Sequence, residues 1–243
     1  MPKTLVLYVF NKKTRLVDSF FKNCIFKDDD THFLVIANGY TENLDDLPSY
    51  VTLIRRENKG YDFGGWSHAL LTSDLYKNYD YFIFANASIY GPFLTPNFKG
   101  KWTDIFINGL SEDIKLFGST INTICKPLTH SHVQSYIFSM NKETFKFLTE
   151  KGIFSLDFDS YGTSKKDIIN EKEIKMSRLI IENGGNIDSC LKHYKGIDFR
   201  FKDKKLEDYN INYHHDFAFP FFKDRIWTLE EVVFIKGNRF NLE

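Results

Sequence analysis

Cysteine is scarce in this sequence of 243 residues. The three cysteines, Cys24, Cys125 and Cys190, are odd in number and far apart. A domain held together by disulfides carries an even set at short spacings, so we expect free thiols in a reducing compartment. This favours a cytoplasmic location.

Long apolar runs are also missing, as are stretches rich in proline, glycine and serine. No segment approaches the roughly 20 apolar residues of a membrane-spanning helix, and only peripheral contact with a membrane stays open. The first apolar run, Leu5–Phe10, is short and lacks a following small-residue cleavage site, so we interpret it as a strand and not as a signal peptide. Without a linker, the chain is expected to form a single domain.

The chain has no excess charge of either sign, since Lys plus Arg and Asp plus Glu both number 32. This excludes the basic footprint that nucleic-acid binding requires. What is abundant is aromatic residues, with 25 Phe and 13 Tyr. Most of them must build a core, and some are candidates to line a cleft in which a sugar or a base stacks.

Short β-prone runs alternate with helical patterns, which predicts an α/β fold with a mostly parallel sheet. In the first part of the chain, Tyr81–Ala85 is a continuous apolar run typical of a strand buried on both faces. Later, a long strand is expected over 133–140 and a short one over 232–235. The expected elements of the first part are strands at 5–10, 33–37, 51–57 and 81–85 and helices at 15–26 and after Gly65.

Two polar clusters follow predicted strands. Asn58, Gly60 and Asp62 come after the third strand, and Asn86 and Ser88 come after the fourth. Ligands of parallel sheets bind at the carboxyl ends of the strands, so the two clusters are expected to share one cleft.

Other strand ends supply further candidates. Gly64 and Gly65 would let the backbone approach a ligand closely. Asn11 and Asn38, at the ends of the first two strands, are candidate base or ribose contacts, with ordinary turn residues as the alternative.

Residues 57–62 (ENKGYD) and 79–93 (YDYFIFANASIYGPF) together resemble nucleotide-sugar glycosyltransferases of the GT-A fold, and among these the rhamnan-synthesis F-like, polysaccharide-building enzymes. The resemblance covers residues 4 to about 195. It implies a GT-A-like (Rossmann-like), mostly parallel sheet flanked by helices. It further implies a nucleotide-binding half (1–93), an acceptor-binding half (94–195) and an irregular aromatic C-terminal wrap (196–243).

In that fold an Asp-x-Asp motif after the fourth strand usually holds Mn²⁺ or Mg²⁺ on the donor diphosphate. This sequence has Asn86-Ala87-Ser88 there, and amide and hydroxyl groups are poorer ligands for a hard cation. We therefore predict weak or absent metal dependence. Asp62 is the nearest candidate metal ligand, with a ribose or base contact as its alternative. Lys236 and Arg239 are candidates to neutralise the charge of the diphosphate. The alternative for both is that they are ordinary surface residues.

A helix is predicted over 171–183, and on it Glu173 shares a face with Met176, Ser177 and Ile180. The resembled enzymes place an acidic residue near the start of such a helix. Glu173 is therefore our candidate base for an inverting transfer, with Glu171 second. The alternative is that Glu173 has no catalytic role and only interacts favourably with the helix dipole, which stabilises the helix by about 0.3–1 kcal/mol.

Histidines raise the question of zinc. His130-x-His132 and His214-His215 lack a nearby cysteine pair, and adjacent histidines point apart, so zinc is not expected. His132 and Gln134 remain candidate acceptor contacts.

The function that follows is transfer of a hexosyl or deoxyhexosyl group from a nucleotide-diphosphate sugar to a glycan or glycolipid. A non-catalytic relative that binds a nucleotide sugar or glycan is the main alternative, favoured by the missing Asp-x-Asp. A nucleotidyltransferase would need a glycine-rich loop after the first strand, and residues 10–15 contain no glycine.

Overall fold

The computed structural model describes residues 1–123, 131–161, 164–201, 221–222 and 225–237. Its centre is a seven-stranded sheet in the order β10-β6-β9-β4-β1-β2-β3. The strands are β1 (Thr4–Phe10), β2 (Thr31–Asn38), β3 (Thr52–Arg56), β4 (Tyr81–Asn86), β6 (Ile114–Gly118), β9 (Ile137–Asn141) and β10 (Asn186–Ser189). Strand β9 is antiparallel to β4 and β6, and the other pairs are parallel. The predicted mostly parallel sheet flanked by helices is confirmed.

The remaining elements surround this sheet. Short ladders join β5 (Ile89–Tyr90) to β13 (Ile235–Lys236), β7 (Ile121–Asn122) to β8 (His132–Val133) and β11 (Phe221–Phe222) to β12 (Arg225–Ile226). The α-helices are α1 (Arg15–Asn23), α2 (Tyr61–Leu71), α3 (Trp102–Asn108), α4 (Lys142–Glu150), α5 (Lys165–Ile168), α6 (Lys175–Glu182) and α7 (Leu229–Val232). Tighter 3₁₀ turns are η1 (Leu75–Asn78), η3 (Phe158–Tyr161) and η5 (Lys192–Tyr194), and a π-helical turn, η4 (Ile169–Ile174), leads into α6.

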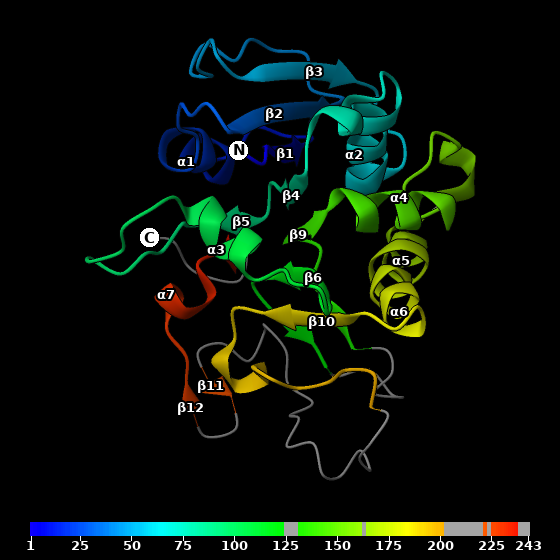
Figure 1. Ribbon diagram of the computed structural model, residues 1–243. Helices are drawn as coiled ribbons and strands as arrows, with labels where there is room; N and C mark the ends of the chain where they lie inside the picture. Colours follow the sequence, from blue (N-terminus) through cyan, green and yellow to red (C-terminus); the bar gives the residue numbers. More distant parts are fainter. Residues whose placement is uncertain (124–130, 162–163, 202–220, 223–224, 238–243) are drawn as a thin grey trace.

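Helices cover both faces of the sheet, with α2, α4 and α6 on one side and α1 and α3 on the other (Figure 1). Strand β1 supplies both cores, because successive side chains of a strand point to opposite faces. Leu5, Leu7 and Val9 join the core under α2, α4 and α6, whereas Val6, Tyr8 and Phe10 join the core under α1 and α3. This explains the near-continuous apolar runs of the inner strands.

Two predicted strands differ from the structure. The run at 133–140 is divided into β8, which pairs with β7, and β9, which pairs with β4 and β6 of the main sheet. The run at 232–235 is mostly not a strand. The hydroxyl of Thr228 caps α7, which ends at Val232, and Val233 has a φ of 65°. Only Ile235 and Lys236 pair, and they return to β5.

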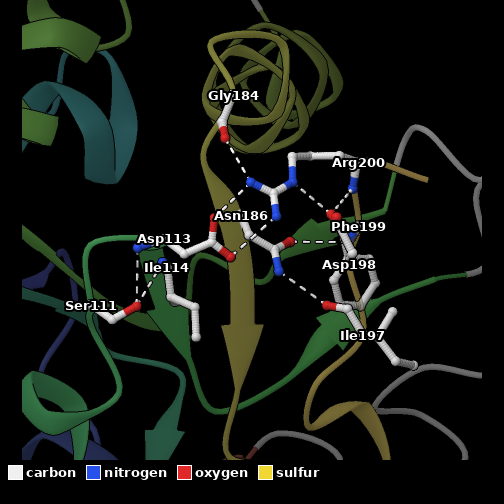
Figure 2. A network of polar contacts seen from close by, with 9 residues as sticks. All are labelled: Ser111, Asp113, Ile114, Gly184, Asn186, Ile197, Asp198, Phe199 and Arg200. Carbon is white, nitrogen blue, oxygen red and sulfur yellow. Dashed lines mark hydrogen bonds and ion pairs between the residues drawn. The ribbon is translucent and has the colours of Figure 1, made fainter. Parts of the chain in front are cut away.

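Residues 197–200 are fixed to the sheet edge by a polar network (Figure 2). The side chain of Asn186, at the start of edge strand β10, donates to the carbonyl of Ile197 and accepts from the amide of Phe199. Arg200 pairs with both carboxylate oxygens of Asp113, before β6, at 2.6 and 3.2 Å. The edge strand is thereby tied to the segment that follows it.

Within the described residues, no helix is long and apolar enough to cross a membrane. The division into a nucleotide-binding half, an acceptor-binding half and a C-terminal wrap stays a prediction.

Candidate functional site

The loop between β3 and α2 makes an unusual turn at the carboxyl end of the sheet. Gly60 has a φ of 73° and Tyr61 a φ of 53°, so two successive residues are left-handed. Glycine adopts this conformation freely, but tyrosine does so at a cost of roughly 1–2 kcal/mol. The turn starts α2 beside the end of β4 and places Asp62 in its first turn.

Asn38 organises the same turn from β2. Its side-chain NH₂ donates to the carbonyl of Tyr61 at 3.0 Å, and its side-chain oxygen accepts from the guanidinium of Arg56 at 2.8 Å. Gly65 permits this packing, since a Cβ there would lie 2.9 Å from the side chain of Val9 and 3.1 Å from that of Asn38. Asn38 and Gly65 thus have structural roles in this turn, and their predicted contact with a nucleotide stays a prediction.

Gly64 lies where a side chain would overlap the turn, since a Cβ there would be 2.1 Å from the carbonyl oxygen of Lys59. Helix propensity alone would make Gly64→Ala stabilising by about 1 kcal/mol. Overpacking costs about 1–3 kcal/mol, so we expect net destabilisation and a lower urea midpoint. His68→Ala changes the same helix at a partly exposed position and should have a smaller effect. A Gly64→Ala protein as stable as wild type would contradict the need for this close turn.

Asp62 and the end of β4 meet directly, as the shared cleft predicted. The side-chain NH₂ of Asn86 donates to Oδ2 of Asp62 at 3.0 Å. The side-chain oxygen of Asn86 accepts from both the amide and the hydroxyl of Ser88. The two sequence clusters therefore form one polar corner, which we call the Asp62 corner: Asp62, Asn86 and Ser88.

The surroundings of this corner act in opposite directions on the pKa of Asp62. Burial raises the pKa of Asp62 to about 6, opposed by the hydrogen bond from Asn86 and by the positive charge of Lys165, while Glu173 raises the pKa further. At neutral pH the carboxylate is mostly ionised but poorly solvated. A strained site of this kind, holding a perturbed acid, is a candidate functional site.

Glu173 lies on the π-helical turn η4, close enough to raise the pKa of Asp62. Its Oε1 accepts from the amide of Ser135 at 2.8 Å, and one helical turn later the hydroxyl of Ser177 accepts from the amide of Val133 at 3.1 Å. One carboxylate oxygen is therefore held in place, while the other has no hydrogen-bond partner within the described part of the chain. Single π turns occur frequently at functional sites. Glu171, by contrast, is exposed and pairs with Lys175 at 3.3 Å.

Lys165 brings positive charge to the corner, whereas the ammonium of Lys236 lies over the ring of Tyr136, 5.4 Å from its centre. Lys236 lies on β13, and the next amide, that of Gly237, donates to the carbonyl of Ser88 at 2.7 Å. Lys165, at the start of α5, is close enough to lower the pKa of Asp62. Lys165 is a residue that sequence reasoning missed, because nothing in its local pattern distinguishes it from any other exposed lysine.

Other predicted residues lie elsewhere. Asn11 and Asn58 are exposed at strand ends, and Asn58 lies beside Gly39. His132 and Gln134 are 3% and 4% exposed, and the side-chain oxygen of Gln134 accepts from Thr120 at 2.7 Å. Such burial does not favour acceptor contact, which stays a prediction. The candidates and histidines that lie outside the described residues are Arg239, His130, His214 and His215.

The Asp62 corner does not suit a divalent metal. The amide oxygen of Asn86 already accepts two hydrogen bonds from Ser88, and its NH₂ faces Asp62. This leaves one carboxylate of raised pKa, whereas Mg²⁺ and Mn²⁺ favour several charged or free oxygen ligands. In the described ranges no cluster of three His, Cys, Asp or Glu side chains could hold a metal ion.

Comparison with solved structures gives distant likenesses. A glycosyltransferase involved in glycosylating the major capsid of PBCV-1 is 15% identical, with a TM-score of 0.43 over 77% of this chain and 81% of that one. The glycosyltransferase GlyE of Streptococcus pneumoniae TIGR4 is 11% identical, with a TM-score of 0.42 over 80% of this chain and 47% of that one. These similarities are too weak to assign a substrate or a mechanism.

Sequence comparison is more decisive. No curated protein matches the chain. The model of the family described as rhamnan synthesis protein F, however, matches residues 34–237, a span that contains both polar clusters and the helix of Glu173. The resemblance seen in residues 57–62 and 79–93 is thereby confirmed, and the chain belongs to the rhamnan synthesis protein F family.

Proposed function

We propose that this protein transfers a hexosyl or deoxyhexosyl group, with inversion, from a nucleotide-diphosphate sugar to a glycan or glycolipid acceptor. Membership of a family named for rhamnan synthesis supports sugar transfer in polysaccharide building. The observation that supports the mechanism is that Glu173, held by the amide of Ser135, is close enough to raise the pKa of Asp62.

The two carboxylates have different tasks in this proposal. An ionised carboxylate only accepts hydrogen bonds, so Asp62 suits hydroxyl groups of the ribose or the donor sugar and not a phosphate. Glu173, fixed through one oxygen by Ser135, offers its other oxygen to the acceptor hydroxyl. Removal of that proton lets the hydroxyl oxygen attack the anomeric carbon as the bond to the diphosphate breaks.

The leaving diphosphate needs positive charge. Because the corner does not suit a metal, we assign this task to Lys165, which is close enough to lower the pKa of Asp62, and to Lys236, whose strand β13 pairs with β5 just after Ser88. Ammonium groups bind phosphate as point charges and require no fixed coordination geometry.

The proposal is tested by thermal shift against nucleoside diphosphates and nucleotide sugars, followed by a transfer assay with the ligands that bind. A ligand at about 100 times its dissociation constant should stabilise the fold by about 2.7 kcal/mol. A protein that is stabilised by none of them and transfers no sugar would overturn the proposal.

We expect transfer to be largely unaffected by EDTA, because lysines and not a metal neutralise the leaving group. The assay compares turnover in EDTA, Mg²⁺ and Mn²⁺, with Lys165→Met and Lys236→Met as variants that should lower turnover in all three. Lys166→Met, an exposed neighbour of Lys165, is the control. Complete loss in EDTA with recovery in Mn²⁺ would show that an acidic ligand has been overlooked.

A non-catalytic relative remains the second candidate, favoured by the carboxamide of Asn86 where related glycosyltransferases carry an aspartate. It predicts nucleotide-sugar binding with neither transfer nor hydrolysis under any metal condition.

A further inference from the structure

A lysine occupies a core position of the helix that carries Glu173. Buried positions recur every four residues along α5, η4 and α6, at Ile168, Lys172, Met176 and Ile180. The lysine is 3% exposed, and the other three residues are apolar. An ammonium group is costly to bury, and such a position is ordinarily apolar. Lys172 therefore contributes something that a hydrophobic side chain would not.

Lys172 is held by neutral partners. Its Nζ donates to the carbonyl of Gly152 at 2.6 Å and lies 3.8 Å from the centre of the Tyr161 ring. Within the described ranges no carboxylate forms an ion pair with it. Burial lowers the pKa of Lys172 to about 8, so the ammonium persists at neutral pH. A charged group above an aromatic face gains up to about 2 kcal/mol when desolvated, which offsets part of its burial.

Tyr161 continues the connection to α2. Its hydroxyl lies 2.7 Å from the hydroxyl of Ser67 on α2, and it also bonds to both the amide and the carbonyl of Ser155. The same ring packs against the left-handed turn, since a Cβ at Gly60 would lie 3.3 Å from it. Lys172 is thereby linked through Tyr161 to the helix whose first turn carries Asp62.

Lys172 and Glu173, which are adjacent in the π-helical turn, therefore contact different parts of the fold. Glu173 and Ser177 attach the helix to the amides of Ser135 and Val133. Lys172 attaches it to Gly152 and Tyr161. The first attachment connects the helix to the end of β8 and the segment between β8 and β9, and the second connects it to Tyr161, which contacts α2.

On this geometry we propose that Lys172 is a positioning residue, which acts through Tyr161 and Ser67 to set Glu173 against the Asp62 corner. The inference rests on the proposed function, because the distance it sets is that between base and donor. A displacement of about 1 Å between reacting groups can cost about 10²-fold in rate. A leucine or methionine at 172 would fill the space but would lose both directional attachments.

The test compares Lys172→Met with Lys172→Arg, which keeps the cation. Lys175→Met, an exposed lysine on the same helix, is the matched control. We expect Lys172→Met to lower kcat by about 10–10²-fold with the donor KM within about twofold. Lys172→Arg should recover most of kcat, and the control should match wild type. An arginine variant as impaired as the methionine variant would overturn the proposal, because volume and not charge would then be decisive.

A second readout does not depend on activity. Hydrogen exchange of the Ser135 amide, which Glu173 holds, should accelerate in Lys172→Met while the amide of Phe84 in β4 stays protected. Unchanged exchange at Ser135 would overturn the positioning role. A wild-type protein without any transfer would overturn the proposed function instead, and the exchange result would still decide about Lys172. If Lys172→Met fails to fold, Tyr161→Phe keeps the ring and removes the bonds to Ser67 and Ser155, and should accelerate exchange at Ser135.

Discussion

Replacing Glu173 by glutamine is expected to lower sugar transfer by about 10²–10⁴-fold, the usual effect of losing a general base. Glutamine keeps an oxygen that can accept from the amide of Ser135, so the local fold should persist. In the proposed function the donor binds at the Asp62 corner and not at the base, so we expect nucleotide affinity to change little. Single-turnover rates and nucleotide titration measure the two effects separately.

Glu171→Gln is the matched control for this experiment. Glu171 lies two residues away, but it is exposed and paired with Lys175, so its loss should leave turnover near that of wild type. If Glu171→Gln abolishes transfer and Glu173→Gln does not, the base is Glu171. A product of retained anomeric configuration would contradict the single-base mechanism as a whole.

Asp62→Asn is expected to stabilise the protein while weakening the donor complex. The pKa of Asp62 is about 6 in the folded protein and the ordinary pKa of an aspartate is 3.8, so the folded protein binds this proton more tightly. The contribution of Asp62 to the free energy of unfolding therefore falls as the pH rises from about 4 to about 6, and it stays at the lower value above pH 6. The shift corresponds to at most about 3 kcal/mol at pH 7, and solvent screening of the partly exposed side chain reduces it.

Urea unfolding at pH 4 and pH 7 measures this effect. Asp62→Asn should match wild type near pH 4 and exceed it by about 1–3 kcal/mol at pH 7, because asparagine can still accept from Asn86. Asp45→Asn, an exposed aspartate, should show no such pH-dependent gain. An Asp62→Asn protein that is less stable at pH 7 would contradict the cost assigned to this carboxylate.

The same variant should bind the donor about 10–10²-fold more weakly, the usual effect of losing a hydrogen bond to a charged group. Isothermal titration with the best nucleotide sugar measures this affinity. Increased stability together with reduced affinity is expected of a functional residue that strains the fold. Unchanged donor affinity would remove Asp62 from the binding site.

Much of the fold could be predicted because its signals are local. The alternation of β-prone and helical runs predicts the parallel strands, and these strands form the centre of the sheet. Strand β9 was harder to predict. An antiparallel strand inserted between β4 and β6 has no local signature that separates it from a parallel one.

The core of the site is also encoded locally. Clusters that follow parallel strands must meet at one edge of the sheet, and the contact between Asp62 and Asn86 bears this out. The helical spacing of Glu173 with Ser177 likewise predicts that both face the same neighbour, and both bind amides of one extended segment.

The amino-acid sequence by itself indicated the family, most of the strands and helices and the two polar clusters, because each depends on residues close together in the chain. Only the tertiary structure decided how these parts are used. Asn38 stabilises a turn, Lys165 approaches Asp62, and Lys172 is buried against Tyr161. These roles depend on which distant segments pack together, and a lysine's identity alone does not reveal whether it faces water or an aromatic ring.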